Sequence, residues 1–105
     1  MAEFPDSGHE SEVITKLRPK LEKPKLFKVI LHNDDFTTMD FVVFVLEYVF
    51  NRTDAEAFTI MLKVHREGTG VAGIYPYEVA NMKSQKAMNL AKAREFPFLC
   101  TVEED

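Results

Sequence analysis

The first patterned segment of the chain is a short apolar run that ends in a polar loop. Residues 26–31 read Leu-Phe-Lys-Val-Ile-Leu, a mixture of β-branched, aromatic and aliphatic side chains that favours a buried strand. Residues 32–35, His-Asn-Asp-Asp, are turn formers and close the run. The pattern therefore predicts a strand that leads directly into an acidic loop.

A central helix is predicted after this loop. Residues 39–50 are apolar on nearly every face, which indicates a helix that is buried on most sides. Thr37, with Asp40 three residues later, matches a capping box and is expected to open this helix.

A second helix follows the break at residues 51–52. Thr53 and Glu56 form another capping box at its start, and Gly68 is expected to end it. Its apolar positions recur at helical spacing and make one stripe: Phe58, Met61, Leu62 and His65. His65 is thus expected to share the apolar face and not to face water.

The remaining residues predict a strand, a third helix and a closing strand. Residues 71–75 suit a strand flanked by glycines, Pro76 suits the first turn of a helix that runs to about Glu95, and residues 98–102 suit a last strand. The order β-α-α-β-α-β predicts an α/β (α+β) sandwich, with a three-stranded antiparallel sheet packed against three helices.

Composition changes this picture mainly at the amino-terminal end. Residues 1–24 mix charged and polar side chains with three prolines, a composition that does not repay the entropy of folding, so a flexible tail is expected there. Residues 25–105 then form one core domain, since 105 residues suit a single domain and 46% of them are hydrophobic.

Charge and targeting signals exclude several classes of protein. The formal net charge of −4 argues against binding of nucleic acid. Cys100 is the only cysteine, which fits a reducing compartment. Residues 1–12 show no secretory signal and the longest apolar run, residues 41–46, is too short to span a membrane. A soluble, cytoplasmic protein without a membrane partner is expected.

Two polar features have candidate chemistry, and each also has a purely structural interpretation. Adjacent Asp residues between a strand and a helix are commonly turn formers, and a His on an apolar helical face is commonly a core residue. A small metal-dependent enzyme is a second possibility, because four side chains are competent ligands: His32, Asp34, Asp35 and His65. They lack a recognised ligand spacing, and no motif links Cys100 to a catalytic base. No metal, cofactor or catalytic residue is therefore assigned.

Apolar residues next to these polar features suggest a mixed pocket. Met39 and Val42 follow the acidic loop, and Met61 and Val64 precede His65. Such a pocket suits a ligand with a positive charge beside a bulky hydrophobic side chain. A protein α-amino group, with a pKa of roughly 7.7–8.0, beside a large first residue meets this description. The alternative of a general protein-interaction domain, in which the acidic loop is only a helix cap, stays open at this point.

Several segments match one known pattern in the same order: residues 33–42, 61–65 and 70–73, then Glu78-Val79-Ala80 with Lys83, and residues 97–101. They resemble the ClpS family, the ATP-dependent protease adaptors of the bacterial N-end rule pathway, and the resemblance covers about residues 25 to 103. It implies a non-catalytic adaptor that grips the free amino terminus and the bulky first residue (Phe, Leu, Tyr or Trp) of N-degron proteins. It also implies delivery to a Clp AAA+ unfoldase.

The resemblance implies a role for each matching residue. The α-amino group would be bound by Asn33, Asp34 and His65, and the adjoining backbone by Asp35 and Thr37. The hydrophobic pocket would be lined by Met39, Val42, Met61, Val64 and Phe98, with Met39 as the gate against β-branched side chains. The amino-terminal domain of the unfoldase would dock at Glu78 and Lys83. The tail would help to transfer substrate, and the adaptor is expected to be a monomer.

Three positions depart from the family pattern. His32 stands where an aliphatic residue is familiar, and Thr38 stands where Pro is frequent. Phe98 occupies a position where Leu is common, so we expect a shallower cavity that prefers Leu or Phe over Trp.

Overall fold

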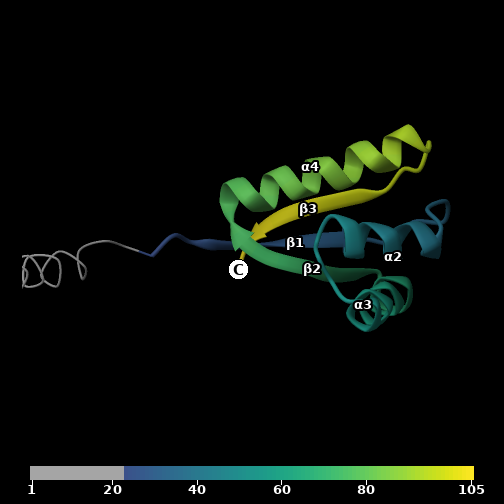
Figure 1. Ribbon diagram of the computed structural model, residues 1–105, viewed down its shortest axis with the longest axis horizontal. Helices are drawn as coiled ribbons and strands as arrows, with labels where there is room; N and C mark the ends of the chain where they lie inside the picture. Colours follow the sequence, from purple (N-terminus) through teal and green to yellow (C-terminus); the bar gives the residue numbers. More distant parts are fainter. Residues whose placement is uncertain (1–22) are drawn as a thin grey trace, which may run out of the picture.

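The structure is a computed structural model that describes residues 23–105, so nearly all of the predicted tail (residues 1–24) lies outside the described residues. Three strands and three helices follow one another in the predicted order (Figure 1). They are β1 (Leu26–His32), α2 (Met39–Tyr48), α3 (Asp54–Glu67), β2 (Thr69–Pro76), α4 (Tyr77–Ala93) and β3 (Leu99–Glu104). The predicted fold class is thereby confirmed.

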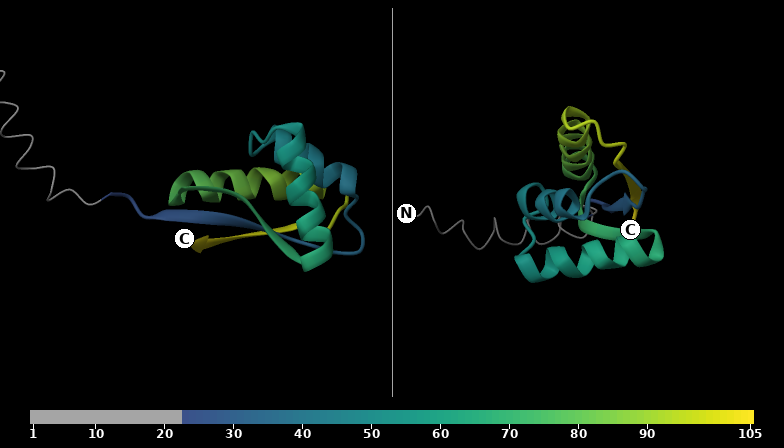
Figure 2. Two further views of the ribbon diagram at one scale, coloured as in Figure 1. Left: turned by 90° about the horizontal axis from the view of Figure 1, so that it is seen from below. Right: turned by 90° about the vertical axis from the view of Figure 1, so that its right-hand side faces the viewer.

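The sheet is antiparallel throughout, and β1 is its central strand. The strand order is β2-β1-β3, with a register shift in the β1–β2 pair between Val29 and Ile30. Helix α4 contacts all three strands, whereas α3 packs against α2 and β2 (Figures 1 and 2). The loop that follows β1 therefore emerges from the middle of the sheet, beside both α2 and α3.

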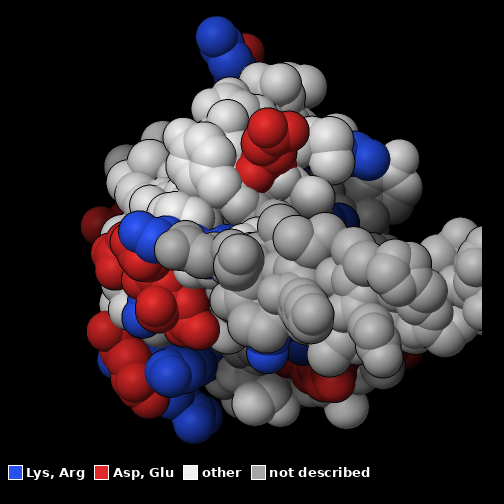
Figure 3. Space-filling model, turned by 90° about the vertical axis from the view of Figure 1, so that its left-hand side faces the viewer, with Lys and Arg blue, Asp and Glu red and all other residues white. Residues whose placement is uncertain are grey.

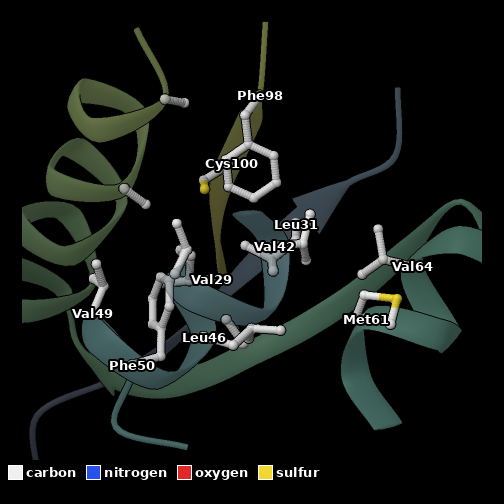
Figure 4. Close-up of a cluster of buried hydrophobic side chains, with 14 of the residues drawn as sticks. Val29, Leu31, Val42, Leu46, Val49, Phe50, Met61, Val64, Phe98 and Cys100 are labelled. Carbon is white, nitrogen blue, oxygen red and sulfur yellow. The ribbon is translucent and has the colours of Figure 1, made fainter. Parts of the chain in front are cut away.

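The core forms where the sheet meets α2 and α4. Alternate residues of β1, Val29 and Leu31, are fully buried, as the two-residue period of a strand requires. Figure 4 shows them among buried side chains from α2, α3 and β3. The Phe41 ring lies at the centre and packs edge-on against Phe96 and Phe98, with centroid separations of 5.1 and 5.9 Å. Within residues 23–105, no helix is both long and apolar enough to cross a membrane.

The predicted cap of α2 is wrong by one residue. Thr38 is the N-cap, and its hydroxyl oxygen accepts a hydrogen bond from the Phe41 amide at 3.2 Å. Thr37 instead bonds through both its amide and its hydroxyl to the carboxylate of Asp34. The helix starts at Met39, as predicted, and ends at Tyr48, two residues before the predicted end.

The predicted ends of α3 are confirmed, but its predicted buried face is not. Thr53 and Glu56 form the reciprocal capping box, and Gly68 ends the helix with a left-handed φ of 94°. The buried side chains are Ala57, Met61 and Val64. His65 and Phe58 are exposed, so the predicted stripe is rotated by about one residue. The small Ala57 side chain allows this face to pack closely, which hydrophobicity alone did not reveal.

The later elements are longer or shorter than predicted. β2 starts at Thr69 and includes both Gly70 and Gly73, because β1 pairs with it along its whole length. Pro76 is the last residue of β2 and the N-cap of α4, and not part of the first helical turn. Helix α4 ends at Ala93, and β3 covers Leu99–Glu104.

Candidate functional site

A pocket of about 260 Å³ lies between the loop after β1, the start of α2 and one side of α3. Nine predicted binding residues line it together: Asn33, Asp34, Asp35, Thr37, Met39, Val42, Met61, Val64 and His65. The polar members come from the loop and the end of α3, and the apolar members come from α2 and α3. One cavity therefore combines hydrogen-bonding groups with a hydrophobic wall.

The carboxylate of Asp34 organises the loop. Its Oδ1 accepts hydrogen bonds from the amides of Phe36 and Thr37 at 2.8 and 2.7 Å, and its Oδ2 accepts one from the Thr37 hydroxyl at 2.7 Å. Such local bonds from an Asp side chain to the backbone two and three residues later fix a tight turn. The loop is therefore preorganised before any ligand binds.

These bonds also set the charge of Asp34. Partial burial raises the pKa of the carboxyl, but the bonds from the Thr37 hydroxyl and from the amides of Phe36 and Thr37 together outweigh it and hold the pKa below the ordinary value of 3.8. The group is consequently an anion at neutral pH, on the polar side of the pocket.

The loop is tied to the end of α3 by its first residue. The Asn33 amide donates to the carbonyl oxygen of Gly68 at 2.9 Å, while the Gly68 amide donates to Val64 at the same distance. The left-handed conformation of Gly68 turns its carbonyl toward the loop. His65, one turn earlier on α3, is thereby held at the pocket with Asn33 and Asp34.

The apolar wall is buried at its base and exposed at its rim. Val42, Met61 and Val64 are buried, and Figure 4 shows Met61 and Val64 on α3 across from Val42 on α2. Met39, the first residue of α2, remains 44% exposed. A ligand side chain would thus pass Met39 before it reaches the base of the pocket.

Gly70 supports this wall, although the sequence suggested only a turn residue. A Cβ atom at Gly70 would lie 2.8 Å from Cγ2 of Val64, closer than real side chains allow. A glycine inside a predicted strand is a signal of such close approach. The position of Val64, and with it one side of the pocket, depends on the missing side chain.

Phe98 and His32 lie outside the lining of the pocket. Phe98 is 5% exposed and packs against Phe41 in the core, so it supports the α2 helix from behind. His32 Nε2 lies 2.8 Å from the hydroxyl oxygen of Thr101 on β3. At these two of the three departures from the family pattern, the side chain therefore contacts other parts of the fold and does not line the cavity.

The structure describes the four candidate metal ligands and the Cys100 thiol. Among the described residues, His, Cys, Asp and Glu form no group of three that could hold a metal ion. Cys100 is buried, and its burial raises the pKa of the thiol to about 12, so the reactive thiolate is suppressed.

Glu78 and Lys83 lie on α4, apart from the pocket. Glu78 is exposed in the first turn of the helix. Lys83 is half-buried: its Nζ donates to the carbonyl oxygen of Val49 at 2.8 Å and lies 5.3 Å from the centroid of the Tyr75 ring. Lys83 therefore joins α4 to the end of α2, a contact that the sequence did not reveal.

Comparisons of the sequence with a family model and with curated proteins identify the same family. A family model described as ATP-dependent Clp protease adaptor protein ClpS matches residues 22–101. ATP-dependent Clp protease adapter protein ClpS of Rhodospirillum centenum is 47% identical over 100 residues, covering 95% of this chain and 93% of the relative. The protein of the same name from Bartonella quintana is 50% identical over 98 residues, covering 93% and 89%.

A solved structure is also similar. Agrobacterium tumefaciens ClpS2 bound to L-phenylalaninamide superposes with a TM-score of 0.76 at 36% sequence identity. The similarity covers 79% of this chain and 100% of that chain. The family match at residues 22–101 includes every residue of the pocket.

Proposed function

Because this chain belongs to the ClpS family of ATP-dependent Clp protease adaptors, which are not enzymes, we propose that it binds the amino-terminal end of N-degron proteins and delivers them to a Clp AAA+ unfoldase. The observation that carries this proposal is the composition of the pocket, in which an anionic, preorganised loop faces a hydrophobic wall. A free α-amino group would bind the polar half of the pocket, formed by the loop, while the bulky side chain beside it would contact the hydrophobic half.

The polar half accounts for recognition of the amine. A protonated α-amino group has three donors, and the pocket offers acceptors at Asn33 Oδ1, at the Asp34 carboxylate and at a ring nitrogen of His65. Asp35 and Thr37 flank these groups and would accept hydrogen bonds from the backbone amides that follow the first residue, since both donors of Thr37 are already bonded to Asp34. Acetylation removes the charge and two donors, and it leaves acceptors of the pocket unpaired.

The hydrophobic half accounts for selection of the first side chain. A volume of about 260 Å³ is slightly below the range of ligand pockets, roughly 300–1,000 Å³, and therefore suits one amino-acid residue. Phe, Leu, Tyr and Trp offer large apolar side chains for contact with Val42, Met61 and Val64. Met39 at the rim excludes side chains that branch at Cβ. The solved relative bound to L-phenylalaninamide supports this proposal, since that ligand has a free amine and a Phe side chain.

Delivery requires a second surface, and the start of α4 is the best candidate. Glu78 is exposed there, and the side chains of Tyr77 and Met82 on the same helix are exposed too. Figure 3, which views the end of the molecule where α4 begins, shows a mainly uncharged surface in its upper part and mixed charges lower on one side. The amino-terminal domain of the unfoldase would dock on this face through Glu78 and Lys83. The adaptor acts as a cytoplasmic monomer, and residues 1–24 take part in substrate transfer.

Fluorescence anisotropy with short peptides tests the proposal. The peptides differ only at residue one (Phe, Leu, Tyr, Trp, Met, Ile or Arg), and each is made with a free and an acetylated amine. Tight binding is expected for free Phe, Leu, Tyr and Trp, and no binding for any acetylated peptide. Binding that ignores acetylation, or that survives Asp34→Ala unchanged, would favour a general interaction domain instead.

A further inference from the structure

One large hydrophobic side chain of the loop has no place in the pocket or the core. Phe36 is 74% exposed, more than any other large hydrophobic residue that the structure describes; the next is Met82 at 61%. Apolar area in water is unfavourable, by roughly 25 cal/mol per Å². An aromatic ring held in water on a loop is therefore available for contact with a partner outside the chain.

The exposure of Phe36 does not come from a loose loop. Its own amide donates to Asp34 Oδ1 at 2.8 Å, and the next amide donates to the same oxygen at 2.7 Å. The Thr37 hydroxyl donates a third hydrogen bond, to Asp34 Oδ2, and so stabilises the same turn. Because the backbone on both sides of Phe36 is fixed, no further ordering of the backbone is needed when a partner contacts the ring.

The position of Phe36 is continuous with the pocket. Its neighbours in the chain, Asp35 and Thr37, both line the cavity, so Phe36 lies at the edge of the cavity although its side chain does not line it. A polypeptide bound by its amine must leave the pocket across this rim. In an extended chain the first and third side chains lie on one side, about 7 Å apart, and the second points the opposite way. A first side chain directed into the pocket thus directs the third toward the rim.

We infer that Phe36 is a specificity-determining residue for the third position of the bound polypeptide, where it favours an apolar or aromatic side chain. The inference rests on the proposed binding of free amino termini. The Phe36 ring adds a second, weaker hydrophobic contact outside the pocket, and only ligands of three residues or more make this contact. A ligand of one residue, such as L-phenylalaninamide, does not reach it.

The test compares wild type, Phe36→Ala and Phe36→Leu in the full chain. Affinities are measured for L-phenylalaninamide and for three peptides that begin Phe-Gly-Leu, Phe-Leu-Gly and Phe-Gly-Gly and are otherwise identical. Phe36→Ala is expected to weaken only the Phe-Gly-Leu peptide, by about three- to tenfold, and Phe36→Leu is expected to restore most of that loss. Phe58→Ala on α3 is the matched control, because Phe58 is also an exposed Phe, but its neighbours in the chain do not line the pocket, unlike those of Phe36.

The outcomes separate this inference from the proposed function. An equal loss for all four ligands, a loss confined to the Phe-Leu-Gly peptide, or no loss at all would overturn the role at the third position. Unchanged peptide affinity with slower delivery to the unfoldase would likewise overturn it and place Phe36 on the docking surface. Failure of the wild-type protein to bind L-phenylalaninamide would instead count against the proposed function itself.

Discussion

The backbone amide of Asn33 donates a hydrogen bond of 2.9 Å to the carbonyl oxygen of Gly68, which joins the acidic loop to the end of α3. The two residues are far apart in sequence, and each belongs to a segment that contributes polar groups to the pocket. Because the bond involves only main-chain atoms, substitution of the Asn33 side chain leaves it intact. The relative position of Asp34 and His65 is therefore set by the fold before a ligand binds.

Asp34 has two tasks, and two substitutions separate them. Asp34→Asn retains an oxygen that accepts from the Phe36 and Thr37 amides but loses the charge, whereas Asp34→Ala loses both. With about 1–3 kcal/mol for each unpaired buried group, we expect peptide affinity to fall about tenfold for Asn and about 100-fold or more for Ala. Anisotropy with a Phe-initiated peptide measures this. Equal losses for the two variants would contradict the role of Asp34 in shaping the loop.

Gly70→Ala is expected to narrow the pocket. The new Cβ would meet Val64 Cγ2 at 2.8 Å, so the wall must shift, at about 1–3 kcal/mol of folding stability. Gly73→Ala is the control, since its new Cβ would instead meet the ring of Tyr75, a residue that does not line the pocket. Urea unfolding should show both variants destabilised, but only Gly70→Ala should lose affinity for a Trp-initiated peptide. An equal loss in affinity would refute the role of Gly70.

Phe98→Leu is expected to change stability and not side-chain preference. Phe98 packs edge-on against Phe41, and loss of this aromatic contact is expected to lower stability by about 0.5–1.5 kcal/mol. The ratio of affinities for Trp-initiated and Leu-initiated peptides should stay the same within error. Val42→Ala, which does change the lining, should alter this ratio. A selective gain for Trp in Phe98→Leu would show that Phe98 shapes the cavity, as the family pattern suggested.

Lys83→Met is expected to weaken the fold as well as unfoldase docking. It removes the hydrogen bond to the Val49 carbonyl and the contact with the Tyr75 ring, together about 1–2 kcal/mol. Glu78→Ala, at an exposed position, should impair docking with stability unchanged within about 0.5 kcal/mol. Urea unfolding and binding to the isolated unfoldase domain distinguish these effects. Unchanged stability of Lys83→Met would mean that its contact with α2 contributes little.

The pH dependence of binding should follow the ionisation of the ligand's α-amino group. The α-amine loses its proton above roughly pH 8, so affinity should fall about 40-fold between pH 7 and pH 9.5. Asp34 stays ionised over this range, because its pKa lies below 3.8. Since folding lowers that pKa, its contribution to stability is complete above 3.8 and is lost as the pH falls from there through the folded-state value. Circular dichroism at each pH verifies that the fold persists, and a flat affinity profile would contradict recognition of the charged amine.

Local signals in the sequence predicted local structure well. The capping box of Thr53 and Glu56 and the end of α3 at Gly68 were correct, because each depends on residues within one helical turn. The cap of α2 was wrong, since Asp34 takes both donors of Thr37 and leaves the cap to Thr38. The two predicted caps had different outcomes because only Thr37 has a competing carboxylate, that of Asp34, three residues upstream.

Features set by packing between elements were harder to predict. Hydrophobicity placed His65 on the buried side of α3, but the small side chain of Ala57 faces the core and turns His65 outward to the pocket. The internal bond of Lys83 joins residues on α4 and α2 that no local pattern connects. The positions of polar and apolar residues suggested a mixed pocket, and the family resemblance added Phe98 to it and a role for each residue; Phe98 is the one that does not line the cavity.

The central position of β1 determines how the site can be lost. The loop with Asn33 and Asp34 continues directly from a strand that is hydrogen-bonded on both sides, to β2 and to β3. Amides of such a strand usually exchange with solvent only when the whole domain unfolds. Native-state hydrogen exchange should therefore give β1 an opening free energy close to that of global unfolding. Fraying of either edge strand leaves the loop anchored by the other, so the ability to bind disappears in the same cooperative step as the fold.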